Sequence, residues 1–299
     1  MTPSHQHAIL GVRFGAVNHT HQIILLMPTN NTPKAPRPTP RPAIVFFDID
    51  DTLFIKDSNS IPKTLIPALT SLKATGTMIA IATGRSIGVI PPIIKTLIEQ
   101  VGIELILSIN GQYNQYQGNK FLDFPLPPTD IHHTITELTT KGITHACMTK
   151  DTIYTFGDDD NLHTALSSLH IGYVPSKHDS FDWQQPIYQI LGFFGDKDTP
   201  PTLPAHLKTV RWHDVAVDIL AQSASKARAI AAVLNHLGID ASQAAAFGDG
   251  LNDQEMIQLV GTGIAMGNAH PTLKAMADFV CLRHDEDGIA HALSDFGWI

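Results

Sequence analysis

The sequence predicts an α/β protein: a Rossmann-like parallel sheet covered by helices, with an α+β cap domain inserted into it. Three observations support this fold class. Short apolar runs alternate with helical patterns over 43–111 and again over 221–299, which is typical of strand–helix–strand units. The stretch 112–220 between them carries hairpin signals instead. Clusters of acidic residues directly follow two of the apolar runs, where open α/β sheets bind their ligands.

The first part of the core is expected to hold three strands and two helices. Its opening run is continuously apolar, as in a strand that is buried on both faces. Pro67 is tolerated only in the first turn of the helix that follows, and Gly76 ends that helix. The expected elements are strands at 43–47, 77–82 and 104–109, and helices at 64–74 and 92–102.

The second part of the core repeats this alternation. A helical pattern after the insert is stopped by Gly238, and short apolar runs follow. The expected elements are helices at 226–236 and 253–260, and strands at 244–247, 263–265 and 279–281.

The insert, 112–220, has a different character. Gly118-Asn119 separates two strand-like runs, which is a hairpin signal, and Lys150-Asp151 separates a second pair. Hairpins accompanied by helices indicate an α+β cap between the two core segments, 43–111 and 221–299. The expected elements are strands at 113–117, 120–125, 143–149, 152–156, 187–193 and 215–220, and helices at 129–140 and 160–169.

Residues 1–42 differ from the rest of the chain. They are rich in proline and contain no acidic residue. Pro28–Pro42 is expected to be an extended, polyproline-like arm, because proline cannot donate backbone hydrogen bonds. We interpret 1–42 as a disordered tail or as an overlong start with Met27 as the true initiator; a targeting or docking arm is the alternative.

Composition excludes several classes of protein. The chain of 299 residues carries a net charge of −8 and has a pI near 6.0, which argues against a basic nucleic-acid binder. No run of 18 apolar residues is present, so no membrane span is expected. Cys147 and Cys281 lie too far apart in sequence to form a disulfide framework, and a cytoplasmic location fits best. We expect a monomer or small homo-oligomer.

The first acidic cluster is Asp48-Ile49-Asp50-Asp51-Thr52, directly after the first strand. A calcium-binding loop does not fit, because Leu53 occupies its glycine position and Asn59 its final glutamate position. Taken alone, the cluster is either part of a site or a solvated acidic turn.

The second acidic cluster, Gly248-Asp249-Gly250-Leu251-Asn252-Asp253, follows another apolar strand. If the two strands are neighbours, both clusters converge on one point, and their carboxylates repel each other unless a cation is present. Mg²⁺ takes one or two protein carboxylates together with a phosphate oxygen. The pattern therefore predicts a magnesium ion and a phosphorylated substrate.

Two further elements fit such a site. Thr83-Gly84-Arg85 follows the second strand, and it offers a hydroxyl and backbone N–H groups to phosphoryl oxygens. Lys226 begins a helix, where it could neutralise phosphate and nucleophile. Taken singly, Thr83 could be only a helix cap and Lys226 only a solvated charge, but the four elements in this order favour the site.

In this order the four motifs resemble those of the haloacid dehalogenase-like phosphohydrolases, and more closely those of the Cof-like subfamily with its large inserted cap. The resemblance covers about 43–299. It implies that Asp48 is the nucleophile, forming an aspartyl-phosphate, and that Asp50 is the general acid/base. It also implies a metal site of Asp48, the backbone carbonyl of Asp50, and Asp249. The remaining implied site residues are Lys226 as a catalytic charge, Thr83, Gly84, Arg85, Asn110 and Asn252 for phosphate and substrate, and Asp253 in support.

Two departures from the family pattern affect how the substrate fits and leave the catalytic groups in place. Asp51 stands where many members have Gly, and Ala227 follows Lys226 where Gly is common.

We also expect other carboxylates to crowd Asp50 and to raise its pKa, so that it can protonate the leaving alkoxide. Trp212 lies in the cap and could pack there or meet the substrate.

The leading hypothesis is a Mg²⁺-dependent phosphatase for a small phosphorylated metabolite. The resemblance suggests a sugar phosphate or a phosphorylated cofactor, such as a vitamin B6 or flavin mononucleotide type of substrate. A phosphomutase with the same intermediate would differ by returning the phosphate, so released phosphate without isomerisation would exclude it. A non-catalytic sensor of phosphometabolites is the alternative from another class, and it has no need of an acid/base such as Asp50.

Overall fold

The computed structural model describes residues 40–299. The arm expected over 1–42 therefore lies outside the described residues, except for its last three. Among these, Pro42 is buried, and its carbonyl oxygen accepts a hydrogen bond from Thr77 Oγ1 at 2.9 Å. Since Ala43 N also donates to Gln243 O at 2.7 Å, the packed part of the chain begins before residue 43.

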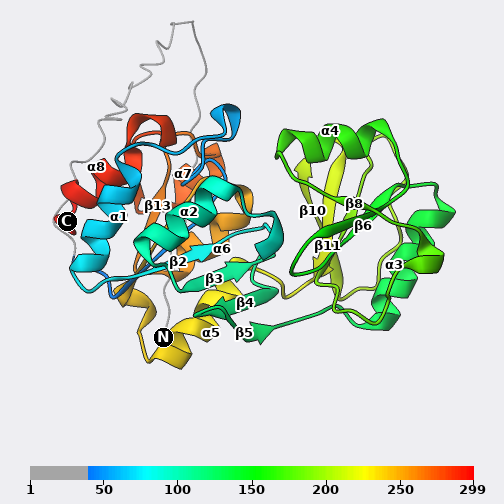
Figure 1. Cartoon of the computed structure of the whole chain (residues 1–299), viewed down its shortest axis with the longest axis horizontal. Coiled ribbons are helices and arrows are strands. Elements are labelled where there is room, and N and C mark those ends of the chain that lie inside the picture. Colours follow the sequence, from blue (N-terminus) through cyan, green and yellow to red (C-terminus); the bar gives the residue numbers. More distant parts are fainter. Residues whose placement is uncertain (1–39) are drawn as a thin grey trace, which may run out of the picture. The chain divides into compact units, whose positions relative to one another are not determined.

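The core sheet confirms the predicted strand–helix alternation. In the described residues it has eight strands, in the order β14-β13-β12-β1-β2-β3-β4-β5 (Figure 1). The strands are β1 (Ile44–Phe47), β2 (Met78–Ala82), β3 (Leu105–Ser108), β4 (Tyr113–Tyr116), β5 (Asn119–Asp123), β12 (Ala244–Gly248), β13 (Thr262–Ala265) and β14 (Phe279–Val280). The six strands from β14 to β3 are parallel, and β4 and β5 are antiparallel additions.

The strand order creates a switch point at the centre of the sheet. From β1 the chain moves outward through β2 to β3, and it later returns to the other side of β1 at β12. Every residue of β1 is fully buried, as expected for a parallel strand with helices on both faces. Open α/β sheets bind ligands outside the carboxyl ends of the strands at such a point.

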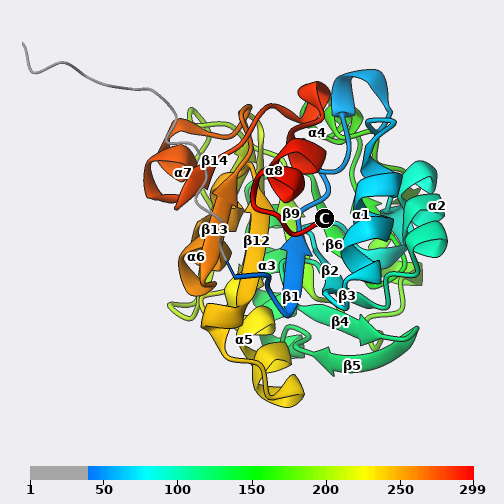
Figure 2. The same ribbon diagram turned by 90° about the vertical axis from the view of Figure 1, so that its left-hand side faces the viewer.

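Two helical layers cover the core sheet (Figure 2). α1 contacts α2 and α8, and α6 contacts α5 and α7. The first group is α1 (Leu65–Ala74), α2 (Pro92–Val101) and α8 (Gly288–Asp295), and the second is α5 (Lys226–Leu237), α6 (Gln254–Leu259) and α7 (Pro271–Met276). The sequence predicted α1, α2, α5 and α6; the short helices α7 and α8 were not predicted.

A second sheet forms the inserted cap, in the order β10-β11-β9-β6-β7-β8. Its strands are β6 (His145–Met148), β7 (Ile153–Phe156), β8 (Val174–Pro175), β9 (Gln189–Gly192), β10 (Leu207–His213) and β11 (Ala216–Ala221). Its helices are α3 (Pro128–Thr140) and α4 (Asp160–Ser168). In β6, Cys147 packs in the cluster of α3, whereas Ala146 and Met148 pack in the cluster of α4. Because alternate residues of a strand face opposite sides, α3 and α4 cover opposite faces of the cap sheet.

The hairpin at Gly118-Asn119 belongs to the core sheet and not to the insert, where the sequence analysis placed it. Its strands are β4 and β5, and Tyr113 of β4 pairs with Ser108 of β3. The hairpin signal was correct, but a local turn does not specify which sheet the strands join. We therefore propose that the cap domain begins after β5, near Phe124.

The cap also buries a histidine. His145 is 3% exposed and stacks on Phe156 with ring centroids 5.5 Å apart. Its Nδ1 lies 3.0 Å from the carbonyl oxygen of Ile143, and its Nε2 has no hydrogen-bond partner. Burial lowers the pKa of His145 to about 4, so the imidazole is neutral in the folded protein.

We expect acidification to destabilise the fold through this residue. In the unfolded chain His145 titrates near its ordinary value of 6.5, so the unfolded state takes up a proton that the folded state does not. The stabilisation by neutral His145 is complete at pH values above 6.5, the pKa in the unfolded chain. It is lost as the pH falls toward about 4, the pKa in the folded protein. This linkage amounts to about 2 kcal/mol between roughly pH 7.5 and 5. Urea unfolding at both pH values would measure it, and His145→Gln should remove most of the difference; an unchanged difference would assign it to other groups.

Candidate active site

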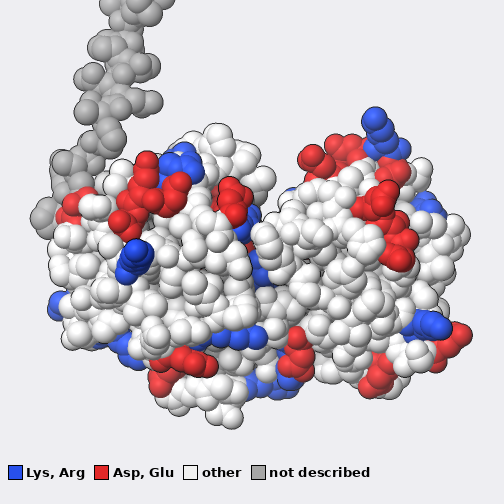
Figure 3. All heavy atoms as spheres, turned by 45° about the horizontal axis from the view of Figure 1, so that its top comes forward, with Lys and Arg blue, Asp and Glu red and all other residues white. Residues whose placement is uncertain are grey.

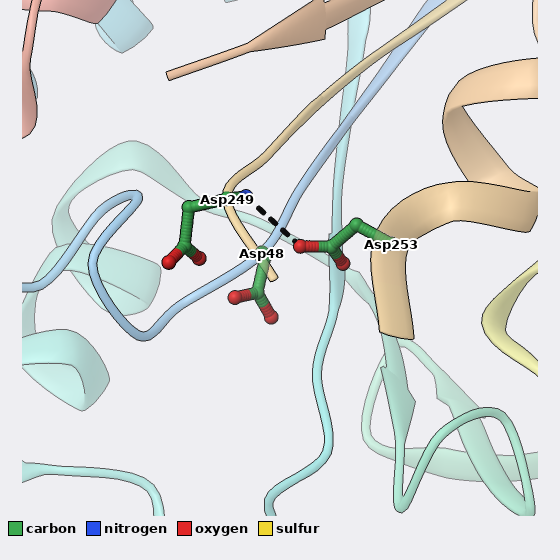
Figure 4. A group of neighbouring side chains, drawn as sticks. All are labelled: Asp48, Asp249 and Asp253. Atoms are coloured by element: carbon green, nitrogen blue, oxygen red, sulfur yellow. Dashed lines mark hydrogen bonds between the residues drawn. The ribbon is translucent and has the colours of Figure 1, made fainter. Parts of the chain in front are cut away.

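The two acidic clusters meet at the switch point, as predicted. Phe47 pairs with Phe247 in the parallel register of β1 and β12, so the residues that follow each strand emerge side by side. Carboxylate oxygens of Asp48, Asp249 and Asp253 all lie within 4.8 Å of one another. Figure 4 shows the three side chains converging, Asp48 and Asp249 from loops and Asp253 from the start of a helix.

Lys226 lies within this acidic cluster, in the first turn of α5. Its Nζ donates to Asp48 Oδ1 and to Asp253 Oδ1, each at 2.6 Å, and the residue is only 1% exposed. Burial opposes its charge, but the carboxylates of Asp253 and Asp48 raise the pKa of Lys226 above its ordinary value. Lys226 is therefore a permanently charged cation that is oriented by two carboxylates.

Asp253 organises the loop after β12. Its Oδ2 accepts hydrogen bonds from the backbone N–H groups of Asp249 and Gly250, both at 2.9 Å (Figure 4 draws the first). Its Oδ1 is engaged by Lys226. Both oxygens of Asp253 are therefore occupied, and its carboxylate ties Lys226 to the backbone of Asp249 and Gly250.

The other two carboxylates of the cluster have fewer partners: Asp48 accepts from Lys226, and Asp249 accepts from Thr52 Oγ1 at 3.4 Å. Burial raises the pKa of Asp48 to about 7; Lys226 opposes this rise and the Asp253 carboxylate adds to it. Burial also raises the pKa of Asp249, and the carboxylates of Asp48 and Asp253 add to that rise. A buried set of oxygen donors that repel one another is the environment that a hard divalent cation stabilises.

Asp50 differs from the sequence-based expectation. Its carboxylate forms a bidentate ion pair with Arg85: Nε to Oδ2 and Nη2 to Oδ1, both 2.8 Å. The side chain thus has a guanidinium partner that the sequence analysis did not expect, although it also lies near enough to Asp48 for the two carboxylates to repel each other. A bidentate pair fixes the orientation of the carboxylate, so Arg85 is placed to position Asp50.

Arg85 also links the core to the cap. Its Nη2 donates to the carbonyl oxygen of Leu169, at the end of α4, at 2.7 Å, and its Nη1 donates to Val89 O at 3.2 Å. The residue is 3% exposed. Arg85 was predicted to bind phosphate; in the structure the hydrogen bonds of its guanidinium go to Asp50 and to these two carbonyl groups.

The other residues of this motif have different environments. Thr83 is fully buried, and its Oγ1 accepts a hydrogen bond from Arg85 N at 3.1 Å, so it shapes the turn. Gly84 faces the cleft, and a Cβ there would lie 3.4 Å from Asn110 Oδ1. The glycine therefore brings the backbone close to the polar floor of the site.

A chain of amides crosses from core to cap. Asn252 Nδ2 donates to Asn110 Oδ1 at 3.1 Å, and Asn110 Nδ2 donates to Gln189 Oε1 of the cap at 3.4 Å. The predicted substrate residues Asn110 and Asn252 are thus joined. Gln189 was not predicted, because nothing in its local sequence marks it.

The backbone at Asn110 is unusual. Ile109 and Asn110 have φ of 53° and 51°, a left-handed conformation that is rare for a β-branched residue. Gly111 follows with φ of 80°, and a Cβ there would lie 2.8 Å from Ser225 O. Residues 109–111 pack against the loop before α5, and Asn110 lines the cleft. Backbone strain of this kind is common at functional sites.

Asp51, the departure from the family glycine, also has a positive φ, of 52°. Aspartate tolerates this conformation better than most residues. Its carboxylate pairs with Lys56 Nζ at 2.8 Å, and its carbonyl oxygen accepts from Asn268 Nδ2 at 2.7 Å. Asp51 thus has the left-handed backbone conformation that favours glycine, and contacts of its side chain and carbonyl hold it there.

A cleft of about 480 Å³ joins these groups. Figure 3 shows acidic and basic side chains at the core side of the hollow between core and cap. Its volume suits a small molecule. The core residues that line it and were predicted as site residues are Asp48, Asp50, Gly84, Arg85, Asn110, Asp249 and Asn252. The other core residues of the lining are Lys56, Gly250, Leu251, Asn268 and His270.

Comparison with known proteins identifies the family. The family model for haloacid dehalogenase-like hydrolases matches residues 45–293. The chain is 36% identical over 256 residues to "Putative phosphatase YkrA" of Bacillus subtilis (strain 168), covering 85% of this chain and 97% of that protein.

Solved structures with a similar fold support the same family. A hypothetical protein from Geobacillus kaustophilus HTA426 is similar with a TM-score of 0.74 and 35% identity, over 87% of this chain and all (100%) of that one. The sugar phosphatase BT4131, of subclass IIB, is similar with a TM-score of 0.75 and 27% identity, over 86% of this chain and 99% of that one.

Fold and site together define an α/β phosphohydrolase with an inserted cap. More particularly, the chain belongs to the haloacid dehalogenase-like hydrolases, in the Cof-like group of subclass IIB, and it is a phosphatase of that family. The resemblance based on the four motifs is confirmed. Within residues 40–299, no helix is both long and apolar enough to cross a membrane.

Proposed function

We propose that this phosphatase is Mg²⁺-dependent and hydrolyses a small phosphorylated metabolite through an aspartyl-phosphate on Asp48. The observation that supports this most is the position of Asp48: its Oδ1 is held by Lys226 beside Asp249, at the floor of a cleft that the cap covers. A carboxylate fixed by one oxygen has the other free to attack phosphorus. This attack splits one difficult displacement into two easier ones.

The donor set fits a magnesium ion. Asp48 is buried and Asp249 half-buried, and their raised pKa values reflect incomplete compensation of their charges, whereas Asp253 is already satisfied by Lys226 and two backbone N–H groups. We therefore assign the metal to Asp48 and Asp249, with the backbone carbonyl of Asp50 as the third protein ligand that the family implies. Bound there, Mg²⁺ would neutralise the carboxylates and the phosphoryl oxygens.

Asp50 is the proposed general acid/base. In the first step it protonates the oxygen of the leaving group, and in the second it takes a proton from the water that hydrolyses the aspartyl-phosphate. Arg85 keeps its carboxylate oriented. Lys226 neutralises charge on Asp48 and on the phosphoryl group, and Asn252 and the backbone of Gly84 are placed to bind phosphoryl oxygens.

The substrate is proposed to be a sugar phosphate or a phosphorylated cofactor. BT4131 is named a sugar phosphatase, and the Bacillus subtilis relative YitU, 23% identical over 278 residues, is named a 5-amino-6-(5-phospho-D-ribitylamino)uracil phosphatase. Both names describe small phosphomonoesters, which the cleft volume suits. Cys147 and Cys281 are free thiols, in keeping with the cytoplasmic location that we propose.

Phosphate release from a panel of monoesters tests this function. We expect hydrolysis of p-nitrophenyl phosphate and of at least one metabolite, without isomerised product. EDTA should abolish activity and Mg²⁺ should restore it. Asp249→Asn should raise the Mg²⁺ concentration needed for half-maximal activity, because one of two carboxylate ligands is lost. Full activity in EDTA would contradict the metal assignment, and isomerisation without phosphate release would indicate a mutase.

A further inference from the structure

Two short linkers connect the cap to the core. They are 124–127, between β5 and α3, and 222–225, between β11 and α5. In the second linker, Gln222 N donates to His206 O of the cap at 2.7 Å. The next residue, Ser223, is exposed, so this linker can bend where the chain leaves the cap.

The first linker is anchored on both sides of a proline. Phe124 N donates to Gln112 O of the core, and Leu126 N donates to Ile187 O of the cap, both at 2.8 Å. Pro125 lies between them, is exposed and has no N–H group to anchor it. A movement of the cap relative to the core must therefore bend this linker next to Phe124.

Arg228, in the first turn of α5, contacts both linkers. Its guanidinium lies over the ring of Phe124, with Cζ 3.7 Å from the ring centroid, and its Nη1 donates to Ser223 Oγ at 3.0 Å. Its Nη2 donates to Gln112 Oε1, and the backbone of Gln112 anchors Phe124. One planar cation thus joins the two linkers to each other and to the core.

These contacts stabilise the charge of Arg228. Within residues 40–299 no carboxylate forms an ion pair with it, and burial lowers the pKa of its guanidinium. The face of an aromatic ring attracts a guanidinium, and hydrogen bonds from a charged donor are stronger than neutral ones. If the linkers move apart, Arg228 loses these partners, so its charge opposes their separation.

α5 fixes Arg228 relative to the catalytic groups. Ser225 caps this helix, and its Oγ accepts from Arg228 N at 3.2 Å. Lys226, in the same turn, is held by Asp48 and Asp253. The linkers are therefore attached to the helix that carries Lys226, which holds the cap in register with the active site.

We propose that Arg228 is a positioning residue that clamps the two linkers and so holds the cap closed over the active site. Loosening the clamp lowers the fraction of molecules in which the cap is closed, and a substrate that needs the closed form then binds with lower apparent affinity. Neither Arg228 nor its partners Phe124, Ser223 and Gln112 line the cleft. The clamp therefore acts on binding and not on the chemical step, whichever monoester is the substrate.

Hydrogen exchange at Gly88 reports the position of the cap. Gly88 belongs to the core, and its N–H donates to Lys150 O of the cap at 3.2 Å. A Cβ at Gly88 would overlap Asp151 O, so core and cap touch closely here. Asn110 N donates to Thr83 O within the core at 3.0 Å and is the internal reference. Opening of the cap exposes the Gly88 amide and leaves the Asn110 amide protected, whereas unfolding of the core exposes both.

Variants of Arg228 test the clamp. Arg228→Met should raise the exchange rate of Gly88 relative to Asn110 about tenfold or more, because two hydrogen bonds from a charged donor and a cation–π contact are lost. Arg228→Lys keeps a cation near Phe124 but lacks the fork that reaches both oxygens, so its rate should be intermediate. Arg283→Met is the matched control, since Arg283 is an exposed arginine of the core, and it should leave the exchange ratio unchanged.

Steady-state kinetics separate the clamp from a loss of structure. With p-nitrophenyl phosphate and Mg²⁺, Arg228→Met should raise KM about tenfold and change kcat by less than about twofold, because bound substrate still closes the cap. A partly unfolded protein would instead show a lower kcat at an unchanged KM, and that result would contradict the proposal.

Single contacts assign the effect to the linkers. Phe124→Leu and Ser223→Ala should each raise Gly88 exchange by less than Arg228→Met, and neither should add to it in the Arg228→Met background. The proposal is wrong if Gly88 exchange is unchanged in both Arg228 variants, if Asn110 exchange rises equally, or if Phe124→Leu keeps its full effect without Arg228. Exchange needs no catalysis, so these results judge the clamp independently of the proposed function, which phosphate release tests.

Discussion

Asp48→Asn should reduce phosphate release by about 10⁴-fold or more, the scale of losing a catalytic nucleophile. The amide keeps the shape of the side chain, but its nitrogen and neutral oxygen cannot form the mixed anhydride with phosphorus. Acid-quenched reactions of the wild type should contain phosphoenzyme, and those of the variant should contain none. Steady-state phosphate release and the quenched sample measure these two results independently.

The structure indicates that this loss will not come from unfolding. Lys226 keeps its 2.6 Å contact with Asp253 when Asp48 is neutralised, and removing one of several crowded carboxylates relieves repulsion. The melting temperature should therefore be unchanged or higher. Asp57→Asn is a suitable control, because Asp57 is exposed on the same segment. Near-normal turnover by Asp48→Asn would show that the aspartyl-phosphate mechanism is wrong.

The core sheet and the convergence of the two acidic loops were predictable for a physical reason. Parallel strands that are buried on both faces must be apolar along their length, so runs such as β1 and β12 stand out in sequence. Polar residues directly after them mark the carboxyl ends of the strands. Asp48 and Asp249 were therefore placed together although they are about 200 residues apart.

Contacts between side chains of the cleft were not predictable in the same way. The Arg85–Asp50 pair and the Asn110–Gln189 contact depend on how separate segments pack, and no local pattern encodes this. Asp218 is different, because a lone aspartate within the apolar run of β11 is a visible sequence signal. It could have been singled out as a carboxyl group that is half-buried in the wall of the cleft.

Short helices and a strand of mixed polar and apolar residues were missed for other reasons. α7 and α8 contain only six and eight residues, so their helical period is weak; α6 also has only six residues but was predicted, so length alone does not explain the difference. β10 alternates polar with apolar residues and lies at the edge of the cap sheet, so it has no continuous apolar run. In each case tertiary packing, more than local propensity, stabilises the element.

Asp50→Asn should lower turnover by about 10²–10⁴-fold, the usual contribution of a general acid/base. The nucleophile and the backbone carbonyl of residue 50 remain, so substrate and Mg²⁺ should still bind. The amide oxygen still accepts one hydrogen bond from Arg85, but the bidentate pair is lost. Thermal melting would measure how much stability the fold loses when the buried guanidinium of Arg85 no longer has its bidentate partner. Asp51→Asn is the adjacent control, because the Asp51 carboxylate pairs with Lys56 and has no assigned chemical step.

Substrates with different leaving groups distinguish the two proposed roles of Asp50, protonation of the leaving group and activation of water. p-Nitrophenolate needs little protonation, so formation of the phosphoenzyme should be nearly unimpaired in Asp50→Asn, whereas its hydrolysis lacks the base that activates water. Phosphoenzyme should therefore accumulate, stable to acid and cleaved by hydroxylamine as an acyl phosphate is. An alkyl phosphate should show little accumulation, because its leaving alkoxide also needs the lost proton. If p-nitrophenyl phosphate gives no accumulation while turnover falls, Asp50 acts only before the intermediate, and a different group must activate the water.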